Sequence, residues 1–247
     1  MAKKTRQAAT YPGTLNCACL IHGDLYDWQY VDKLYHMLCR HLSASVVLHV
    51  YTEHHRPVPE PYIKHPLIDW GISGPKRSWW YKMQLFNSDF YRGPLLYLDL
   101  DTVIVNNIDW IWKQGCNHLW TIRDFKYLWR PSLNNINSSV IWWDTTRFDH
   151  IWRDFQSRDL REIMRKYHGD QDYLTEAISP AQRRCFATDQ VKSWRWECLD
   201  GGFDFRSRKY LDPGSGTNIP DTTSILIFHG HPKPDKVQDP YIQAHWC

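Results

Sequence analysis

The fold is decided by the stretch LNCACLIHGDLYDWQYVDKLYHMLCRHLSASVVLHV, which covers residues 15–50. Apolar residues run from Leu15 to Ile21 and stop at the polar turn His22-Gly23-Asp24, which predicts a short buried strand. Apolar residues at helical spacing follow, and a second apolar run spans Val46 to Val50. A strand, a helix and a strand in this order form a βαβ unit, which requires a parallel sheet. Such sheets bind ligands at the carboxyl ends of their strands, so the segment from His22 to Tyr26 is the first candidate site.

The rest of the chain continues this alternation of strands and helices. Prolines and glycines from Arg56 to Pro75 predict a long irregular connection, and a helix-like segment from Trp79 to Phe90 follows it. Thr146 and Asp149 have the spacing of a capping box, and an apolar helical face continues from there to Gly169, a residue typical of a helix end. Further strands are expected at Leu95–Leu98, His118–Ile122, Ser139–Trp143 and Ser224–Phe228. The pattern predicts an α/β fold with a mostly parallel central sheet flanked by helices.

Composition is that of one globular domain. Of 247 residues, 43% are hydrophobic and 23% charged, which excludes disorder over most of the chain. We expect a basic N-terminal tail at residues 1–12 and a single domain at residues 13–247. The net charge of +3 suits anionic nucleotides but is too small for a dedicated DNA-binding protein. The 14 Trp and 14 Tyr residues serve mainly in packing, and they also suit stacking on sugars or bases.

The sequence contains no run of apolar residues long enough to span a membrane and no apolar core of a secretion signal. Its seven cysteines are odd in number and include no CxxC pair, which favours neither disulfides nor a zinc site. These features predict a soluble, cytoplasmic protein.

Two carboxylates follow the buried strand that ends at Leu98, in the segment Leu98-Asp99-Leu100-Asp101-Thr102-Val103. Asp99 and Asp101 point to the same side, and unpaired buried carboxylates are costly, so the pair favours binding of a cation. Mn²⁺ or Mg²⁺ would take oxygen ligands from the pair and from a nucleotide diphosphate. The triplet also fits haloacid dehalogenase-type phosphatases, with Asp99 as nucleophile and Asp101 as general acid/base. Those enzymes usually carry it on an early strand, whereas a βαβ unit and a long connection precede it here.

At this point the sequence resembles the GT-A glycosyltransferases, which have a Rossmann-like fold, and most closely the family 8 type that includes glycogenin and lipopolysaccharide galactosyltransferases. The resemblance implies that Asp99 and Asp101 bind the metal and the donor ribose. It also implies that His229 is a metal ligand and that Gly230 and Lys233 contact the donor diphosphate. The family form is His-x-x-Gly-x-x-Lys-Pro-Trp, whereas the spacing here is shorter and the Trp position holds an aspartate. His231 is an alternative ligand.

Other segments extend the resemblance. In the family, an Asn like Asn137 contacts donor or acceptor sugar, and an Asp like Asp124 holds donor sugar hydroxyls. Asp170 and Gln171 match the residues that flank the anomeric carbon. Lys82, in the helix-like segment before the strand that ends at Leu98, matches a basic residue near the donor diphosphate. Asp24 and Tyr26, after the first strand, match the groups that hold the nucleobase.

The sequence therefore predicts a metal-dependent glycosyltransferase with a nucleotide-sugar donor. By resemblance the donor is a UDP-sugar and the reaction retains the anomeric configuration. The acceptor hydroxyl is left open between a glycan, a protein and a modified base in DNA. A noncatalytic protein that binds a sugar or a nucleotide is the third alternative, beside the phosphatase.

Overall fold

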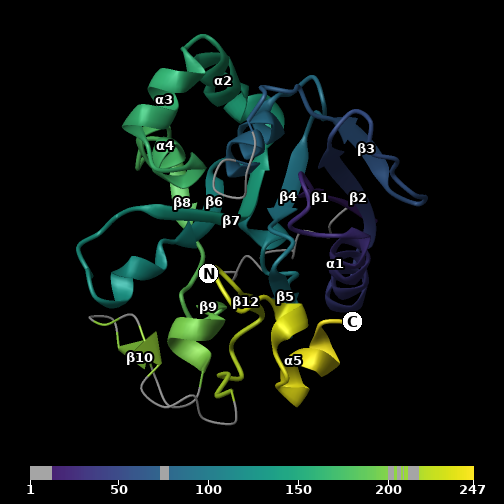
Figure 1. Ribbon diagram of the computed structural model, residues 1–247, viewed down its shortest axis with the longest axis vertical. Helices are drawn as coiled ribbons and strands as arrows, with labels where there is room; N and C mark the ends of the chain where they lie inside the picture. Colours follow the sequence, from purple (N-terminus) through teal and green to yellow (C-terminus); the bar gives the residue numbers. More distant parts are fainter. Residues whose placement is uncertain (1–12, 73–77, 200–202, 205–206, 208, 211–216) are drawn as a thin grey trace, which may run out of the picture.

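The computed structural model describes residues 13–72, 78–199, 203–204, 207, 209–210 and 217–247 (Figure 1). The expected basic tail at residues 1–12 lies outside the described residues. Within the described part of the chain, no helix combines the length and the apolar character needed to cross a membrane.

A seven-stranded sheet forms the centre of the molecule, with the strand order β3-β2-β1-β4-β7-β6-β8. Its strands are β1 (Thr14–Leu20), β2 (Ser45–Thr52), β3 (Ile63–Pro66), β4 (Pro94–Leu98), β6 (Leu119–Arg123), β7 (Ile136–Asp144) and β8 (Arg183–Cys185). Only β7 runs antiparallel to its neighbours, and the other neighbouring strands are parallel. The predicted α/β fold with a mostly parallel sheet is confirmed, and so is the initial βαβ unit.

Smaller elements surround this sheet. The α-helices are α1 (Trp28–His41), α2 (Thr145–Gln156), α3 (Leu160–Lys166), α4 (Asp170–Ala177) and α5 (Pro240–His245). The 3-10 helices are η1 (Ser78–Phe86), η2 (Trp112–Gln114), η3 (Phe125–Leu128) and η5 (Pro234–Lys236), and η4 (Trp194–Cys198) is a π-helix. A three-stranded sheet pairs β5 (Thr102–Ile104), β12 (Ile225–Ile227) and β9 (Val191–Ser193), and a short hairpin pairs β10 (Phe203–Asp204) with β11 (Lys209–Tyr210).

The central sheet separates two hydrophobic cores. Successive side chains of a strand point to opposite faces, so Leu96 and Leu98 of β4 join one core while Leu95 and Tyr97 join the other. The first core contains α1, the small sheet and α5, and the second contains η1 and α2–α4. Figure 1 shows α2, α3 and α4 above the sheet, α1 at its right, and the small sheet with α5 below.

The structure corrects the prediction of an irregular connection over residues 56–72, and residues 73–75 of that connection lie outside the described residues. This connection contains β3, which pairs in parallel with β2 at the edge of the sheet. Prolines are tolerated there because an edge strand leaves one side of its backbone without a partner strand. The helix-like segment from Trp79 to Phe90 is a 3-10 helix that ends at Phe86, and its side chains from Trp80 to Phe86 are all buried.

Two helix-end predictions are also wrong. The cap of α2 is Asp144, whose Oδ1 accepts the backbone N–H of Thr146 at 2.9 Å. Asp149 does not close a capping box, because its Oδ1 accepts the backbone N–H of Ser88 instead. The apolar face predicted to continue to Gly169 is divided, since Asp159 caps a separate helix α3, and Gly169 lies at the start of α4.

Candidate functional site

A cavity of about 500 Å³ lies at the carboxyl ends of β1 and β4. Leu20 ends β1, and Asp99 directly follows β4. Because β7 runs antiparallel to β4, its first residues, Asn137 to Ser139, reach the same edge of the sheet. Residues of η1, the start of α4 and the segment after β12 complete the walls. This is the position where open α/β sheets bind ligands.

Most residues singled out from the sequence meet in this cavity. Those that line it are Tyr26, Lys82, Asp99, Asp101, Asn137, Asp170, Gln171, His229, Gly230 and Lys233. The alternative ligand His231 lines it too, whereas Asp24 and Asp124 do not. Segments that are more than two hundred residues apart in the chain therefore form one site.

The two remaining candidates lie outside the cavity wall. Asp24 is exposed on the segment after β1. Asp124 is buried, caps η3 by accepting the backbone N–H of Lys126, and accepts a hydrogen bond from Gln171 Nε2 at 3.4 Å. Asp124 thus contacts a cavity residue without lining the cavity itself.

Two side chains, those of Tyr97 and Lys82, hold the Asp99 carboxylate. Its Oδ1 accepts the Tyr97 hydroxyl at 2.6 Å and lies 2.9 Å from Lys82 Nζ. Burial acts to raise the pKa of the Asp99 carboxyl, but the Lys82 charge and the Tyr97 hydrogen bond outweigh it and lower the pKa. Asp99 is therefore ionised at neutral pH.

Lys82 lies between two aspartates in the wall of the cavity. Besides Asp99, its Nζ lies 3.5 Å from Asp170 Oδ2 and donates to Ser138 Oγ at 3.1 Å. The Ser138 hydroxyl donates in turn to Asp170 Oδ2 at 2.5 Å. Burial acts to lower the pKa of Lys82, but Asp170 and Asp99 raise it, so the lysine is charged. Because only 6% of Lys82 is exposed, it acts here as the cation between two carboxylates.

Asp101 has its own, separate lysine. Lys233 Nζ donates to its Oδ2, and the Tyr26 hydroxyl donates to the same oxygen at 3.0 Å. The Asp101 carbonyl accepts the backbone N–H of Phe228 at 3.1 Å, which ties this loop to the end of β12. Burial raises the pKa of the Asp101 carboxyl although Lys233 opposes the shift.

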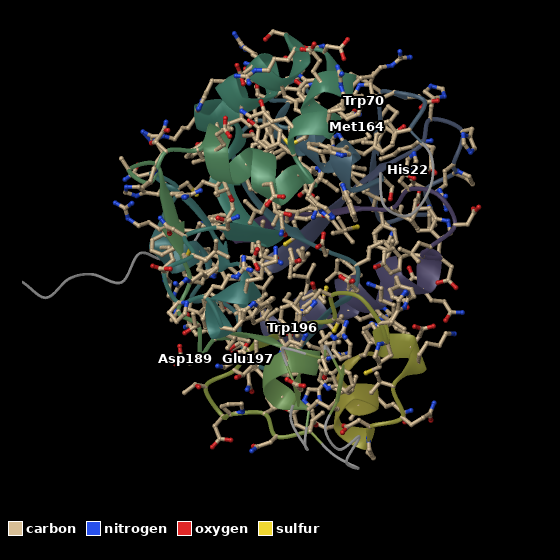
Figure 2. The ribbon with its side chains drawn as sticks, turned by 60° about the vertical axis from the view of Figure 1, so that its left-hand side comes forward. His22, Trp70, Met164, Asp189, Trp196 and Glu197 are labelled. Atoms are coloured by element: carbon tan, nitrogen blue, oxygen red, sulfur yellow. The ribbon has the colours of Figure 1, made fainter. Side chains whose placement is uncertain are left out.

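His229 follows β12 and is packed among aromatic rings. Its ring stacks on Phe125 with centroids 5.4 Å apart and meets the Trp196 ring nearly edge-on at 4.2 Å. His229 Nε2 is 2.6 Å from Ser193 Oγ. Burial, and then the charges of Arg195 and Lys233, lower its pKa to about 3, so the imidazole is neutral at pH 7. Figure 2 shows Trp196 on η4, in the lower part of the molecule.

Gly230 has a structural reason to be glycine. Its φ of +74° is unfavourable for other residues, and a Cβ placed there would lie 2.6 Å from Arg195 Nη1. Arg195 belongs to η4, in a part of the chain without periodicity, so no sequence signal indicated that it packs against the site. The cavity wall also contains Ser78 and Trp79, which sequence reasoning missed.

The residues in the cavity are of the types that hold a divalent cation. Asp99, Asp101 and His229 supply two carboxylates and a neutral imidazole. Of the carboxylate oxygens, the hydrogen bonds and ion pairs described above involve Oδ1 of Asp99 and Oδ2 of Asp101. Among the residues that the structure describes, no three His, Cys, Asp or Glu side chains are arranged closely enough to hold a metal. The donor types therefore fit Mn²⁺ or Mg²⁺, and a cation that binds Oδ2 of Asp101 would have to displace Lys233.

Both lysines of the wall are already paired with carboxylates. Three lining carboxylates (Asp99, Asp101 and Asp170) face two lining ammonium groups, those of Lys82 and Lys233. Burial raises the pKa of the Asp101 and Asp170 carboxyls. A divalent cation would add positive charge to this wall.

No family model and no curated protein matches this chain. Solved structures do match it. Glycosyltransferase GlyE of Streptococcus pneumoniae TIGR4 gives a TM-score of 0.67 at 14% identity over 94% of this chain and 60% of GlyE. The bifunctional glycosyltransferase WbbM gives a TM-score of 0.61 at 11% identity over 96% of this chain and 50% of WbbM. The galactosyltransferase LgtC, in complex with donor and acceptor sugar analogues, gives 0.54 at 11% identity over 89% of each chain.

The chain has a glycosyltransferase fold. This agrees with the GT-A fold class predicted from the sequence. At these identities the likeness concerns the fold, and the narrower resemblance to the family 8 type stays a prediction. The chain spans only about 60% of the length of GlyE and half that of WbbM.

Proposed function

We propose that this chain is a metal-dependent glycosyltransferase that transfers a sugar from a nucleotide-sugar donor to a hydroxyl acceptor. The observation that carries the proposal is one cavity at the strand ends of a glycosyltransferase fold that contains Asp99, Asp101, His229 and Lys233. By the sequence resemblance the donor is a UDP-sugar and the configuration at the anomeric carbon is retained. The protein is expected to act in the cytoplasm.

Metal dependence is supported by the charge of the cavity. Both lining lysines are already paired with aspartates, so a bound cation would supply the positive charge that the diphosphate of the donor requires. Asp99, Asp101 and His229 would hold the cation, and Mn²⁺ or Mg²⁺ would act as a Lewis acid that stabilises the departing nucleoside diphosphate. Lys233, which is paired with Asp101, would then bind a diphosphate oxygen instead.

The other residues of the site would orient the donor. Lys82 fixes Asp99 and Asp170 relative to each other, and the contact of Asp124 with Gln171 fixes the amide. Asp170 and Gln171 would accept and donate hydrogen bonds to the donor sugar. In the transfer the bond from C1 to the diphosphate oxygen breaks, the bond from C1 to the acceptor oxygen forms, and the acceptor proton is released. Catalysis then depends mainly on positioning and on electrostatic stabilisation.

A thermal-shift panel tests the donor site. UDP-, GDP- and CDP-sugars are added with and without Mn²⁺, and a UDP-sugar should raise the melting temperature only when Mn²⁺ is present. Asp101→Ala should abolish this shift. Asp189→Ala serves as the matched control, because Asp189 is exposed and does not line the cavity (Figure 2). No metal-dependent stabilisation by any of the nucleotide sugars would refute the proposal.

The phosphatase hypothesis is not favoured, since the matching folds are glycosyltransferases and Asp99, its expected nucleophile, is tied to Tyr97 and Lys82. Turnover of p-nitrophenyl phosphate that Asp99→Asn abolishes would reverse this conclusion. A noncatalytic binding protein would bind UDP and Mn²⁺ yet neither hydrolyse nor transfer any UDP-sugar.

A further inference from the structure

Trp79 lines the cavity, but the proposed donor site assigns no role to its aromatic side chain. It belongs to η1, is half-buried, and lines the cavity together with Ser78, Asp170 and Gln171. Its ring stacks against His168 with centroids 5.8 Å apart and an interplanar angle of 29°. The indole thus lies beside the start of α4.

The backbone at Gly169, just before α4, packs against this ring. A Cβ on Gly169 would lie 3.3 Å from Trp79 Nε1 and 3.5 Å from its Cε2, so glycine allows the indole to pack directly against the chain. Gly169 immediately precedes Asp170. The distance between the indole and the Asp170–Gln171 pair is therefore set by main-chain contact.

The proposed function assigns different parts of the donor to different lining residues. It assigns the diphosphate to Lys233 and Asp101, and the donor sugar to Asp170 and Gln171. An acceptor must reach the anomeric carbon of that sugar. Trp79 lines the same cavity and packs against Gly169, which directly precedes Asp170 and Gln171.

We propose that the Trp79 ring forms an acceptor subsite, the surface on which a neutral acceptor sugar binds. This proposal rests on the proposed function. The flat apolar face of a pyranose ring packs on an indole, while polar groups at the rim bind its hydroxyls. Here the polar neighbours are Ser78, Gln171 and the carboxylate of Asp170. Of the two lining ammonium groups, Lys82 is paired with Asp99 and Asp170 and Lys233 is assigned to the donor diphosphate. The wall thus offers no further cation for a phosphodiester, so the chemistry favours a glycan hydroxyl over a base in a nucleic acid.

The test compares transfer with hydrolysis of the donor. UDP-glucose and UDP-galactose are incubated with the protein and Mn²⁺, and UDP release is measured with water alone, with maltose, cellobiose or lactose, and with an oligonucleotide containing 5-hydroxymethylated bases. The wild-type protein should form a trisaccharide from at least one of the disaccharides. Trp79→Leu should lower the ratio of transfer to hydrolysis at least about tenfold through a higher acceptor KM, whereas Trp79→Phe should retain most of it.

Two further variants separate the subsite from general packing. Gly169→Ala pushes a methyl group against the indole and should also lower the ratio, with Trp79 itself unchanged. Tyr241→Leu, which changes an exposed aromatic residue outside the cavity wall, should leave the ratio as in the wild type.

Several outcomes would overturn the acceptor subsite. Equal ratios for the wild type and Trp79→Leu would refute it while leaving the donor site intact. Hydrolysis without transfer to any disaccharide, or transfer only to the oligonucleotide, would refute the neutral-sugar assignment. Failure of the wild-type protein to bind or hydrolyse any nucleotide sugar would instead refute the proposed function, and the subsite with it.

Discussion

Replacement of Lys82 by methionine should be among the most destabilising single changes in the site. Methionine keeps most of the side-chain volume but removes the charge that lies 2.9 Å from Asp99 Oδ1 and 3.5 Å from Asp170 Oδ2. Two carboxylates would then remain in the wall without their common cation. Removal of one partner of a buried ion pair costs about 3–5 kcal/mol, because it leaves the other charge uncompensated.

The exposure of each partner refines this magnitude. The side chain of Asp170 is only 6% exposed, whereas that of Asp99 is 24% exposed and can recover part of its hydration. We therefore expect a loss of about 3–4 kcal/mol in the free energy of unfolding. This is a large part of the roughly 5–15 kcal/mol that stabilises a typical domain.

Urea unfolding followed by circular dichroism measures this loss. The matched control is Lys166→Met, because the ion pair of Lys166 with Glu176 has a similar distance of 2.6 Å but both side chains are 58% exposed. That control should cost less than about 1 kcal/mol. The double variant Lys82→Met with Asp170→Asn should regain part of the loss, since one of the two uncompensated charges is gone. A cost for Lys82→Met as small as that of the control would refute the inferred role of the buried lysine.

Other variants test the surroundings of the cavity. Glu53→Gln should reduce the free energy of unfolding at pH 7. Burial acts to raise the pKa of the Glu53 carboxyl, but the hydrogen bond from Arg56 and further hydrogen bonds outweigh it and lower the pKa from 4.5 to about 2. The stability from this depressed pKa is present above pH 4.5 and lost as the pH falls through about 2, so acid titration of unfolding should show both proteins converging there. Gly230→Ala should lower the melting temperature, since the new Cβ meets Arg195 at a positive φ; an unchanged melting temperature would contradict the inferred need for glycine at this position. Lys233→Met should raise the affinity for Mn²⁺ alone and lower that for UDP with Mn²⁺, each about tenfold, in calorimetric titrations; affinities that change in the same direction would refute the exchange of partners.

The fold could be predicted where a long element carries its own pattern. Residues 15–50 contain a continuous apolar strand, an amphipathic helix and a second apolar strand, and these became β1, α1 and β2. Three-residue strands such as β5 and β9 are too short to show a period, so their existence depends on pairing with β12. The 3-10 helix η1 shows no apolar and polar faces in its sequence, since its residues from Trp80 to Phe86 are all buried, including Lys82 and Gln84. Its sequence therefore could not reveal its geometry.

In the candidate site, too, some residues could be predicted from the sequence and others could not. Asp99 and Asp101 follow a buried strand directly, so their position at the edge of the sheet could be inferred from the chain. The place of Trp79 could not, because it depends on the absence of a side chain at Gly169 in another helix. Sequence proximity thus predicts the motif, whereas the walls around it come from tertiary contacts.

Each aspartate of the motif is paired with its own lysine, and this ion pair offsets the cost of removing the carboxylate from water. Lys82 comes from the element before β4 and Lys233 from the segment after β12, and each neutralises one carboxylate. The two lysines differ in what else they contact. Lys82 is also held by Asp170 and Ser138, so its release would leave a second carboxylate unpaired, whereas Lys233 donates its further hydrogen bond to the neutral Phe228 carbonyl. If the proposed metal ion displaced a lysine, the displacement would therefore cost less at Asp101 than at Asp99, and Lys233 would be the lysine that moves to the proposed donor diphosphate.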